Sequence, residues 1–246
     1  MPTPASDRTS ALTVRDVVAG YLSGINILNG MSLDVMPGEV RCVLGPNGSG
    51  KTTTINMLTG HLTPASGHIL VHDSPADGLA ASAFAARKVG RTFQITQLFS
   101  RMSVLENMLV PGLARAHSTW PEATRTARRH LEFLGLSHLE NLQAKNLSGG
   151  QQKLLELGRA LMLDPEILFL DEPFAGVNPF LRDEIIVLIQ TLHAEGRSFV
   201  VVDHDIEAIQ RLVHRLVVMA RGKKIADGTV DEVRANQEVL LAYAGV

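Results

Sequence analysis

The sequence is poor in cysteine and has no long apolar run. Its 246 residues include one cysteine, Cys42, so an internal disulfide is excluded. No segment approaches the ~18 consecutive apolar residues of a membrane-spanning helix. The first ten residues are polar and lack the apolar block of a secretory signal. These absences predict a soluble cytosolic protein that reaches a membrane only through a partner.

An excess of charge of either sign is also absent. The 23 basic and 25 acidic residues give a net charge of −2 and a pI near 6.5, so no overall attraction to nucleic acid or anionic lipid is expected. The sequence does have an ordinary globular composition, with 45% hydrophobic and 20% charged residues. Its length allows one large domain or two small ones.

Segments with strand-like and helical patterns alternate along most of the chain, after a polar tail at residues 1–10 that we expect to be flexible. This alternation predicts an α/β fold with a mostly parallel sheet covered on both faces. The middle of the chain is helical and is interpreted as an insertion into that core. Strands are expected at residues 12–17, 31–35, 40–44, 68–71, 167–170, 199–202 and 216–219. Helices are expected at residues 52–58, 104–110, 121–134, 150–163, 179–195 and 205–213.

A loop of the pattern Gly-x-x-x-x-Gly-Lys-Thr lies between a predicted strand and a predicted helix, as a P-loop requires. Its glycines let successive backbone N–H groups surround a phosphate chain, and the helix N-terminus adds partial positive charge. We expect Lys51 to reach the β- and γ-phosphates and the Thr52 hydroxyl to bind Mg²⁺. The predicted nucleotide-binding residues are Gly45, Pro46, Asn47, Gly48, Ser49, Gly50, Lys51, Thr52 and Thr53.

Two adjacent carboxylates follow a purely apolar segment at residues 167–170. An apolar strand that ends in acidic residues places charge where α/β sheets bind ligands. Asp171 is predicted to bind Mg²⁺, directly or through water. Glu172 is predicted to act as the general base that polarises the attacking water. A solvated turn with two ordinary surface acids is the alternative interpretation of the pair in isolation.

A second glycine motif, Leu147-Ser148-Gly149-Gly150-Gln151, opens a strongly helical segment about twenty residues before the acidic pair. A hydroxyl, free N–H groups and a helix dipole together form a second anion site. With the P-loop and the acidic pair, this motif resembles the signature of ATP-binding-cassette (ABC) ATPases. The resemblance covers the chain from about residue 12 to residue 246. It implies that Ser148, Gly149, Gly150 and Gln151 bind nucleotide.

The resemblance also implies a fold and a domain boundary. ABC ATPases have a P-loop NTPase (RecA-like) core with a parallel sheet, an antiparallel β subdomain and an inserted helical subdomain. In this sequence, residues 11–246 would form one nucleotide-binding domain, with the helical insertion at about residues 95–155.

Further residues gain roles from the same resemblance. Gln94 matches the glutamine that touches Mg²⁺ and the attacking water, and His204 matches the histidine that senses the γ-phosphate. Tyr21 matches the aromatic residue that stacks on adenine. The segment after Tyr21 is one residue longer than the common family spacing, so a tyrosine at the edge of the core is the alternative. Asn178 stands where many ABC proteins have aspartate, and it keeps hydrogen-bonding capacity without charge.

The resemblance implies a dimer as the active form. In the family, the signature of one subunit covers the P-loop nucleotide of the other, so two ATP molecules and their Mg²⁺ would be held between two chains. The second ATPase subunit would be identical or paralogous. A transporter ATPase of this length would power separate integral membrane permease subunits and serve an extracytoplasmic substrate-binding protein indirectly. It would lie on the inner face of the cell membrane, held there by the permease.

Three alternatives for the use of ATP remain at this stage. A P-loop kinase or GTPase leaves the signature unexplained. A non-transport ABC protein of DNA repair or translation usually carries a coiled-coil insertion, zinc-binding cysteines or two cassettes, which this chain lacks, and no nucleic-acid partner is expected. A transporter ATPase is favoured. Residues 93–99, 102–107, 171–179 and 239–245 resemble the branched-chain amino acid importers, with urea or amide importers and the lipopolysaccharide exporter as competitors.

Overall fold

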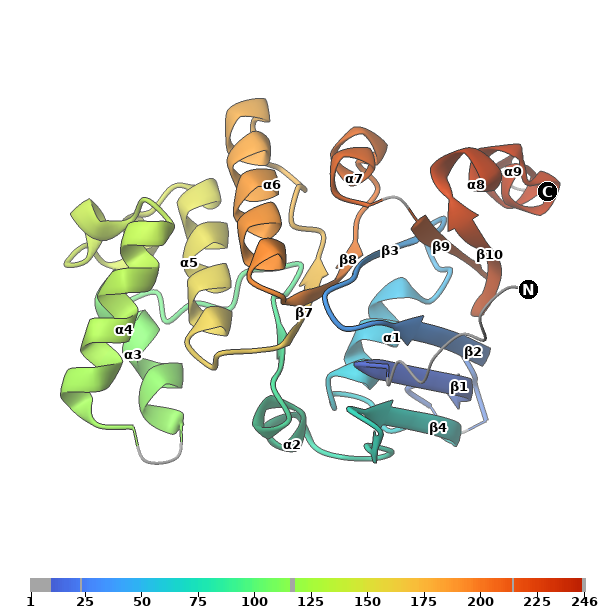
Figure 1. Cartoon of the computed structure of the whole chain (residues 1–246), viewed down its shortest axis with the longest axis horizontal. Helices are drawn as coiled ribbons and strands as arrows, with labels where there is room; N and C mark the ends of the chain where they lie inside the picture. The colour runs from blue at the N-terminus through green and yellow to red at the C-terminus, as the bar shows by residue number, and fades with distance from the viewer. Residues whose placement is uncertain (1–9, 23, 116–117, 214, 245–246) are drawn as a thin grey trace, which may run out of the picture.

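The computed structural model describes residues 10–22, 24–115, 118–213 and 215–244 (Figure 1). The described residues form two neighbouring sheets at one end of the molecule and a group of helices at the opposite end. The predicted α/β fold with a parallel sheet, an antiparallel sheet and a helical region is therefore confirmed. The predicted flexible tail lies outside the described residues except for Ser10.

A six-stranded sheet forms the centre of the described structure, with β3 (Val40–Leu44) between β8 and β9. Its neighbouring strands are parallel except at one edge, where β10 runs antiparallel to β9. Cys42 is fully buried on β3, as expected of a small core residue. The sheet order is β10 (Lys223–Thr229), β9 (Arg215–Ala220), β3, β8 (Ser198–Val202), β7 (Ile167–Asp171) and β6 (Val89–Arg91).

An antiparallel sheet packs against one side of this centre. Its residues alternate between the interior and the surface, as the buried Leu12, Val14, Val17 and Ala19 of the first strand show. Helix α1 (Lys51–Leu58) contributes Ile55, Met57 and Leu58 to the core that both sheets share. The order is β2 (Leu28–Val35), β1 (Leu12–Ala19), β4 (Ser66–Val71) and β5 (Ser74–Pro75).

Helices α3 (Val104–Ala114), α4 (Trp120–Phe133) and α5 (Gly149–Leu161) pack together beside the central sheet (Figure 1). The predicted end of α3 at residue 110 was wrong. The sequence places Pro111 next, and proline removes a helical hydrogen bond. The helix nevertheless continues for one more turn, because a capping box at Ser103 and Glu106 fixes its start and the buried Gly112, just after the proline, packs closely against Met162 and Ala123. Helix α5 was expected to extend to residue 163, but it ends at Leu161.

Helices α6 (Pro179–Ala194) and α7 (Ile206–Leu212) cover the sheet face opposite the antiparallel sheet, where α5 also packs. The predicted helices here differ from the structure by one residue at an end. Several short elements were not predicted, because few residues carry a pattern in each: β5, β6, β10, α2 (Ala81–Ala86), α8 (Val230–Ala235), α9 (Gln237–Ala244) and the 3₁₀ turns Ser137–Leu139 and Ala144–Asn146. No helix among the described residues is both long enough and apolar enough to cross a membrane.

Candidate active site

The glycine loop connects the central strand β3 to helix α1, in the predicted strand–loop–helix context. Gly45 has no room for a side chain, because a Cβ atom there would meet the Met219 carbonyl oxygen and the Ser49 hydroxyl. Gly48 and Gly50 have φ values of 78° and 103°, a left-handed backbone that favours glycine. The sequence therefore fixes a tight turn whose backbone lies at the N-terminus of α1.

The Lys51 ammonium crosses the loop that contains it. Its Nζ donates hydrogen bonds to the carbonyl oxygens of Gly45 at 2.7 Å and Pro46 at 3.0 Å. Burial lowers the pKa of the Lys51 ammonium, and the nearby carboxylates of Glu172 and Asp171 oppose that effect. The positive charge of the loop and the negative charges at the end of β7 thus face one another. Thr52 follows with an exposed side chain, and Thr53 is buried.

Asp171 is the last residue of β7, and its carboxylate is almost fully buried. The guanidinium Nη2 of Arg91 lies 3.6 Å from Oδ2, whereas Oδ1 is buried and has no hydrogen-bond partner among the described residues. Burial raises the pKa of Asp171 against the opposing effect of Arg91. A buried carboxylate oxygen without a partner calls for a cation or a water, so this atom fits the predicted magnesium ligand.

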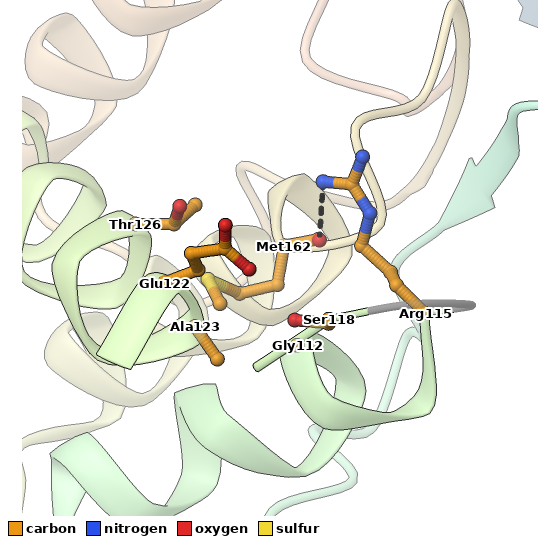
Figure 2. Close-up of a pocket in the computed structure, with 7 residues that line it drawn as sticks. All are labelled: Gly112, Arg115, Ser118, Glu122, Ala123, Thr126 and Met162. Atoms are coloured by element: carbon orange, nitrogen blue, oxygen red, sulfur yellow. Dashed lines mark hydrogen bonds between the residues drawn. The ribbon is translucent and has the colours of Figure 1, made fainter. Parts of the chain in front are cut away.

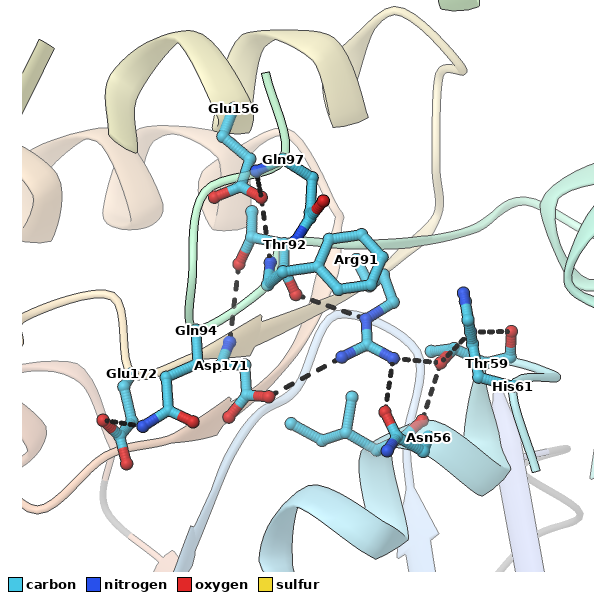
Figure 3. Close-up of polar contacts among 12 residues, drawn as sticks. Asn56, Thr59, His61, Arg91, Thr92, Gln94, Gln97, Glu156, Asp171 and Glu172 are labelled. Carbon is cyan, nitrogen blue, oxygen red and sulfur yellow. Dashed lines mark hydrogen bonds and ion pairs between the residues drawn. The ribbon is translucent and has the colours of Figure 1, made fainter. Parts of the chain in front are cut away.

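Arg91 is held on several sides at once (Figure 3). It donates from Nη1 to the Asn56 side chain at 2.9 Å and to the Thr59 hydroxyl at 3.0 Å, both on or next to α1. Its guanidinium also lies 4.2 Å from the centre of the Phe93 ring, in cation–π contact. Arg91 was not singled out from the sequence, because an arginine at the end of a three-residue strand has no recognisable pattern. The structure shows that it connects α1 to Asp171.

Gln94 and Glu172 come together as predicted for two residues of one site. The Gln94 amide nitrogen donates to Oε2 of Glu172 at 2.9 Å. Glu172 also has a left-handed backbone, with φ of 49°, and its N–H donates to the Val202 carbonyl at 2.7 Å. A glutamate in this conformation is uncommon, and such strain is concentrated at functional sites. The backbone turn therefore directs the Glu172 carboxylate away from the strand and toward Gln94.

His204 follows β8 at the same edge of the sheet, and its side chain is exposed. The neighbouring Asp203 is buried, and its two oxygens accept backbone N–H bonds from Phe174 at 2.9 Å, His204 at 2.7 Å and Asp205 at 3.0 Å. Asp203 therefore fixes the turn that carries His204, and its bond from Phe174 joins this turn to the segment that follows Glu172. The structure gives His204 no hydrogen bond to Glu172 or Lys51.

Tyr21 lies on the surface with 55% of its area exposed, so it is not packed into the core. Its hydroxyl accepts a hydrogen bond from the Asn56 side chain, the same residue that accepts a bond from Arg91. The ring therefore lies near helix α1 with much of its surface open. Among the described residues, no aromatic or guanidinium group stacks on it, and the adenine-stacking role stays a prediction.

The signature motif forms the first turn of α5. The Ser148 hydroxyl accepts from the Gln151 N–H at 3.3 Å, and the Gln151 side chain accepts from the Ser148 N–H at 2.9 Å, which makes a capping box. Ser148 and Gly149 are exposed. Helix α5 stands with the helical group at one end of the molecule, whereas α1 lies between the two sheets (Figure 1). Within one chain, the motif is not brought to the P-loop.

A separate hollow of about 240 Å³ lies within the helical group, between α3, α4 and Met162 (Figure 2). Its charged groups are already engaged within the chain. Arg115 donates to the Met162 carbonyl at 3.5 Å, and Glu122 accepts from Thr119 at the start of α4. This hollow shares no residue with the site described above.

These features fit a nucleotide bound with Mg²⁺. No group of three or more His, Cys, Asp or Glu side chains in the described parts of the chain could hold a metal by itself. A magnesium ion at Asp171 and Thr52 would therefore take further ligands from phosphate oxygens and water, as Mg²⁺ does in nucleotide sites. The fold and the site together define a P-loop nucleotide-binding protein.

Comparison with known proteins narrows this class to one family. A family model described as ABC transporter matches residues 28–175, and the chain belongs to this family. The high-affinity branched-chain amino acid transport ATP-binding protein LivG of Escherichia coli (strain K12) is 37% identical over 240 residues, covering 90% of this chain and 93% of LivG.

Solved structures of ATP-binding cassettes have the same fold. One in its ADP conformation, from an ABC transporter, has a TM-score of 0.85 and 34% identity, and the match covers 96% of this chain and 99% of that one. A dimeric cassette in a post-hydrolysis state, bound to ADP and Pi, has a TM-score of 0.81 and 25% identity, with 89% and 98% covered.

Proposed function

We propose that this chain hydrolyses ATP as the motor subunit of an ABC transporter. The observation that carries the proposal is the Glu172 carboxylate, which the strained turn after β7 and a 2.9 Å bond from Gln94 hold at the same end of the parallel sheet as the loop of Lys51, which follows β3. A carboxylate held beside a P-loop lysine supplies a general base and a phosphate anchor in one site. Proposed site residues are those named from the sequence, including Tyr21 for adenine and Ser148 to Gln151 for the nucleotide of a partner.

In this proposal, each residue has one task. The loop N–H groups and Lys51 bind the β- and γ-phosphates, and Glu172 accepts a proton from the water that attacks the γ-phosphorus. Gln94 and His204 orient the water and the γ-phosphate. Thr52, Gln94 and Asp171 would hold a Mg²⁺ ion together with phosphate oxygens, and the ion would neutralise charge that develops on the phosphates.

The exposed signature motif supports a dimer. Ser148 and Gly149 have N–H groups at a helix N-terminus, but α5 and α1 lie in different parts of the same chain. A second ATPase subunit, identical or paralogous, would place its signature over this P-loop. The related cassette that was solved as a dimer with ADP and Pi has the same arrangement of elements. We also propose that residues 11–246 are one nucleotide-binding domain with an inserted helical subdomain at about residues 95–155.

The proposed cargo is a branched-chain amino acid, because the matched relative is named for that transport and the match covers most of both chains. Permease subunits in the membrane would bind and move the amino acid, and an extracytoplasmic binding protein would deliver it. The chain itself would lie on the inner face of the cell membrane. Its near-neutral charge supports no role for nucleic acid.

The test of ATP hydrolysis compares two variants of the purified chain. Glu172→Gln removes the proton acceptor and keeps the phosphate site, so it should bind ATP normally, turn over at least ~100-fold more slowly and accumulate an ATP-bound dimer. Lys51→Ala should weaken nucleotide binding itself. Turnover is measured by phosphate release, affinity by a fluorescent ATP analogue and assembly by light scattering. Normal turnover of Glu172→Gln would refute the general base, and unchanged affinity of Lys51→Ala would refute the phosphate anchor.

A further inference from the structure

A buried carboxylate on the signature helix holds the loop that carries Gln94. Glu156 lies on α5, two turns beyond the signature motif, and is only 5% exposed. Its Oε1 atom accepts the Phe93 N–H at 3.2 Å and the Gln97 N–H at 3.3 Å. These two N–H groups flank Gln94 on either side, so one oxygen atom fixes both ends of a short loop (Figure 3).

The same helix also contacts this loop, and the chain at the end of β7, through two other residues. Arg159, three residues after Glu156, donates to the Gln97 carbonyl, and its guanidinium lies 4.9 Å from the centre of the Phe99 ring. Lys153, three residues before Glu156, donates to the Glu172 carbonyl at 2.8 Å and to the Pro173 carbonyl at 3.4 Å. Residues three apart lie on one face of a helix. One face of α5 therefore binds both Gln94's loop and Glu172's backbone.

The stability of the fold does not explain a carboxylate at position 156. A carboxylate loses its hydration when it is buried, and burial raises the pKa of Glu156. Its neighbours Leu154, Leu155 and Leu157 are buried apolar residues, so an apolar side chain would suit the helix better. Hydrogen bonds to a charged acceptor are stronger and more directional than neutral ones. The carboxylate is therefore suited to hold the loop in one place.

We infer that Glu156 is a positioning residue for ATP hydrolysis, which transmits the position of the signature helix to Gln94 and through it to Glu172. The inference rests on the proposed hydrolytic function. When the signature motif of this chain binds the nucleotide of a neighbouring subunit, α5 would move as a unit with the Gln94 loop and the end of β7 of the same chain. Glu156 does not touch the phosphates, so it should affect the rate of the chemical step and not the binding of ATP.

The experiment measures ATP turnover of the purified full chain with Mg²⁺. Glu156→Leu removes the acceptor and keeps a side chain of similar size; kcat should fall about tenfold with little change in KM for ATP or in affinity for a fluorescent analogue. Glu156→Gln keeps an oxygen that can accept both N–H groups, and kcat should stay within about threefold of the original value. Glu106→Ala is the matched control, because Glu106 also accepts a backbone N–H in the helical region; its kcat should not change.

A double-mutant cycle separates positioning from general destabilisation. If Glu156 acts through Gln94, then kcat of the Gln94→Ala, Glu156→Leu double variant should equal that of Gln94→Ala alone. If the double variant instead loses kcat by the product of the two separate fold-changes, the inference is overturned. A normal kcat for Glu156→Leu would overturn it as well. Thermal melting confirms that each variant is folded at the assay temperature.

Two further measurements keep the outcomes distinct. If Glu156→Leu does not fold, Arg159→Ala releases the Gln97 carbonyl from the same loop; a fall of about threefold in kcat at constant KM supports the inference, and an unchanged kcat overturns it. If the unmodified chain hydrolyses ATP and Glu172→Gln does not, failure of the Glu156 tests concerns this inference alone. An unmodified chain without hydrolysis would remove the proposed function and the inference with it.

Discussion

At the scale of single residues, the site is built from charges that have been taken out of water. Asp171, Arg91 and Glu156 are each largely buried, and each keeps its place through specific partners. Burial of a charge destabilises a fold unless hydrogen bonds and opposite charges compensate. The compensation here also fixes orientation, because each partner belongs to a different element.

A half-buried histidine outside the site gives a residue-scale prediction about pH. Burial lowers the pKa of His130 on α4 to about 4, with Arg129, Arg197 and Arg115 adding to the effect and Asp164 opposing it. In the unfolded chain, a histidine pKa is about 6.5. Below that pH the unfolded state binds the proton more readily, so stability is complete above pH 6.5 and declines toward pH 4.

The expected loss from this group is about 2 kcal/mol in the free energy of unfolding between pH 7.5 and pH 5. Urea unfolding at the two pH values measures it, and His130→Gln should remove that part of the difference. His138→Gln, at an exposed position in the same helical region, serves as the control and should leave the difference as it is. An unaltered pH dependence in His130→Gln would contradict the assignment.

The sequence predicted residues that belong to motifs and missed those that support them. The glycine loop, the acidic pair, Gln94 and the signature each have a spacing that can be recognised in one chain. Arg91 and Glu156 have none, since their importance comes from neighbours that are distant in sequence. One signal was available for Glu156: a charged residue within the apolar face of a predicted helix needs a buried partner.

At the scale of elements, helix α5 joins two tasks. Its first turn presents the signature motif to the surface, and its following turns hold the Gln94 loop and the end of β7. In the first turn, Gly150 packs against Leu181, whereas packing within the chain does not require glycine at Gly149. A Cβ atom on Gly149 would meet no atom within 4 Å, and its backbone is not in the left-handed region.

Gly149→Ala should therefore fold as well as the original chain. Alanine favours a helix over glycine by roughly 1 kcal/mol, so the melting temperature should stay the same or rise slightly. ATP turnover should nevertheless fall at least ~10-fold if a neighbouring subunit's nucleotide approaches this backbone closely. In the Glu172→Gln background, the ATP-dependent dimer should weaken, as light scattering would show. Full activity in Gly149→Ala would argue against contact between the signature and a nucleotide.

The elements that the sequence predicted well are those with long or purely apolar patterns. β3 matched at both ends, and the helices at residues 179–195 and 205–213 were within one residue at each end. β10 was missed because Lys223, Lys224 and Asp227 interrupt its alternation at the edge of the sheet. Strand order was beyond sequence patterns, since β3 pairs with β8 and β9 across more than 150 residues of chain.

At the scale of the whole molecule, the residues proposed for nucleotide binding lie in two separate places. The phosphate loop, Asp171, Glu172 and His204 lie at or just after the carboxyl ends of β3, β7 and β8, and the signature motif begins α5 in the helical group. A molecule with two such separated half-sites can close both only by pairing head to tail with another. ATP binding and assembly should therefore depend on each other.

Transport is the prediction that belongs to this scale. Cells that lack this chain should lose most of their energy-dependent uptake of labelled leucine, because the permease would lack the subunit that hydrolyses ATP. The original gene should restore uptake, and Glu172→Gln at the same expression level should not. Uptake of labelled urea should be unaffected in all three strains. Normal leucine uptake in the deletion strain, without a paralogous ATPase, would contradict the proposed cargo.

The left-handed backbone at Glu172 has a consequence for how the protein would respond to artificial selection. A residue other than glycine, asparagine or aspartate costs roughly 1 kcal/mol in this conformation, so Glu172→Gly or Glu172→Asn would relieve the local strain. Directed evolution for heat resistance alone would thus tend to replace the residue that we propose as the general base. A screen that scores growth on an imported nutrient would discard the same clones.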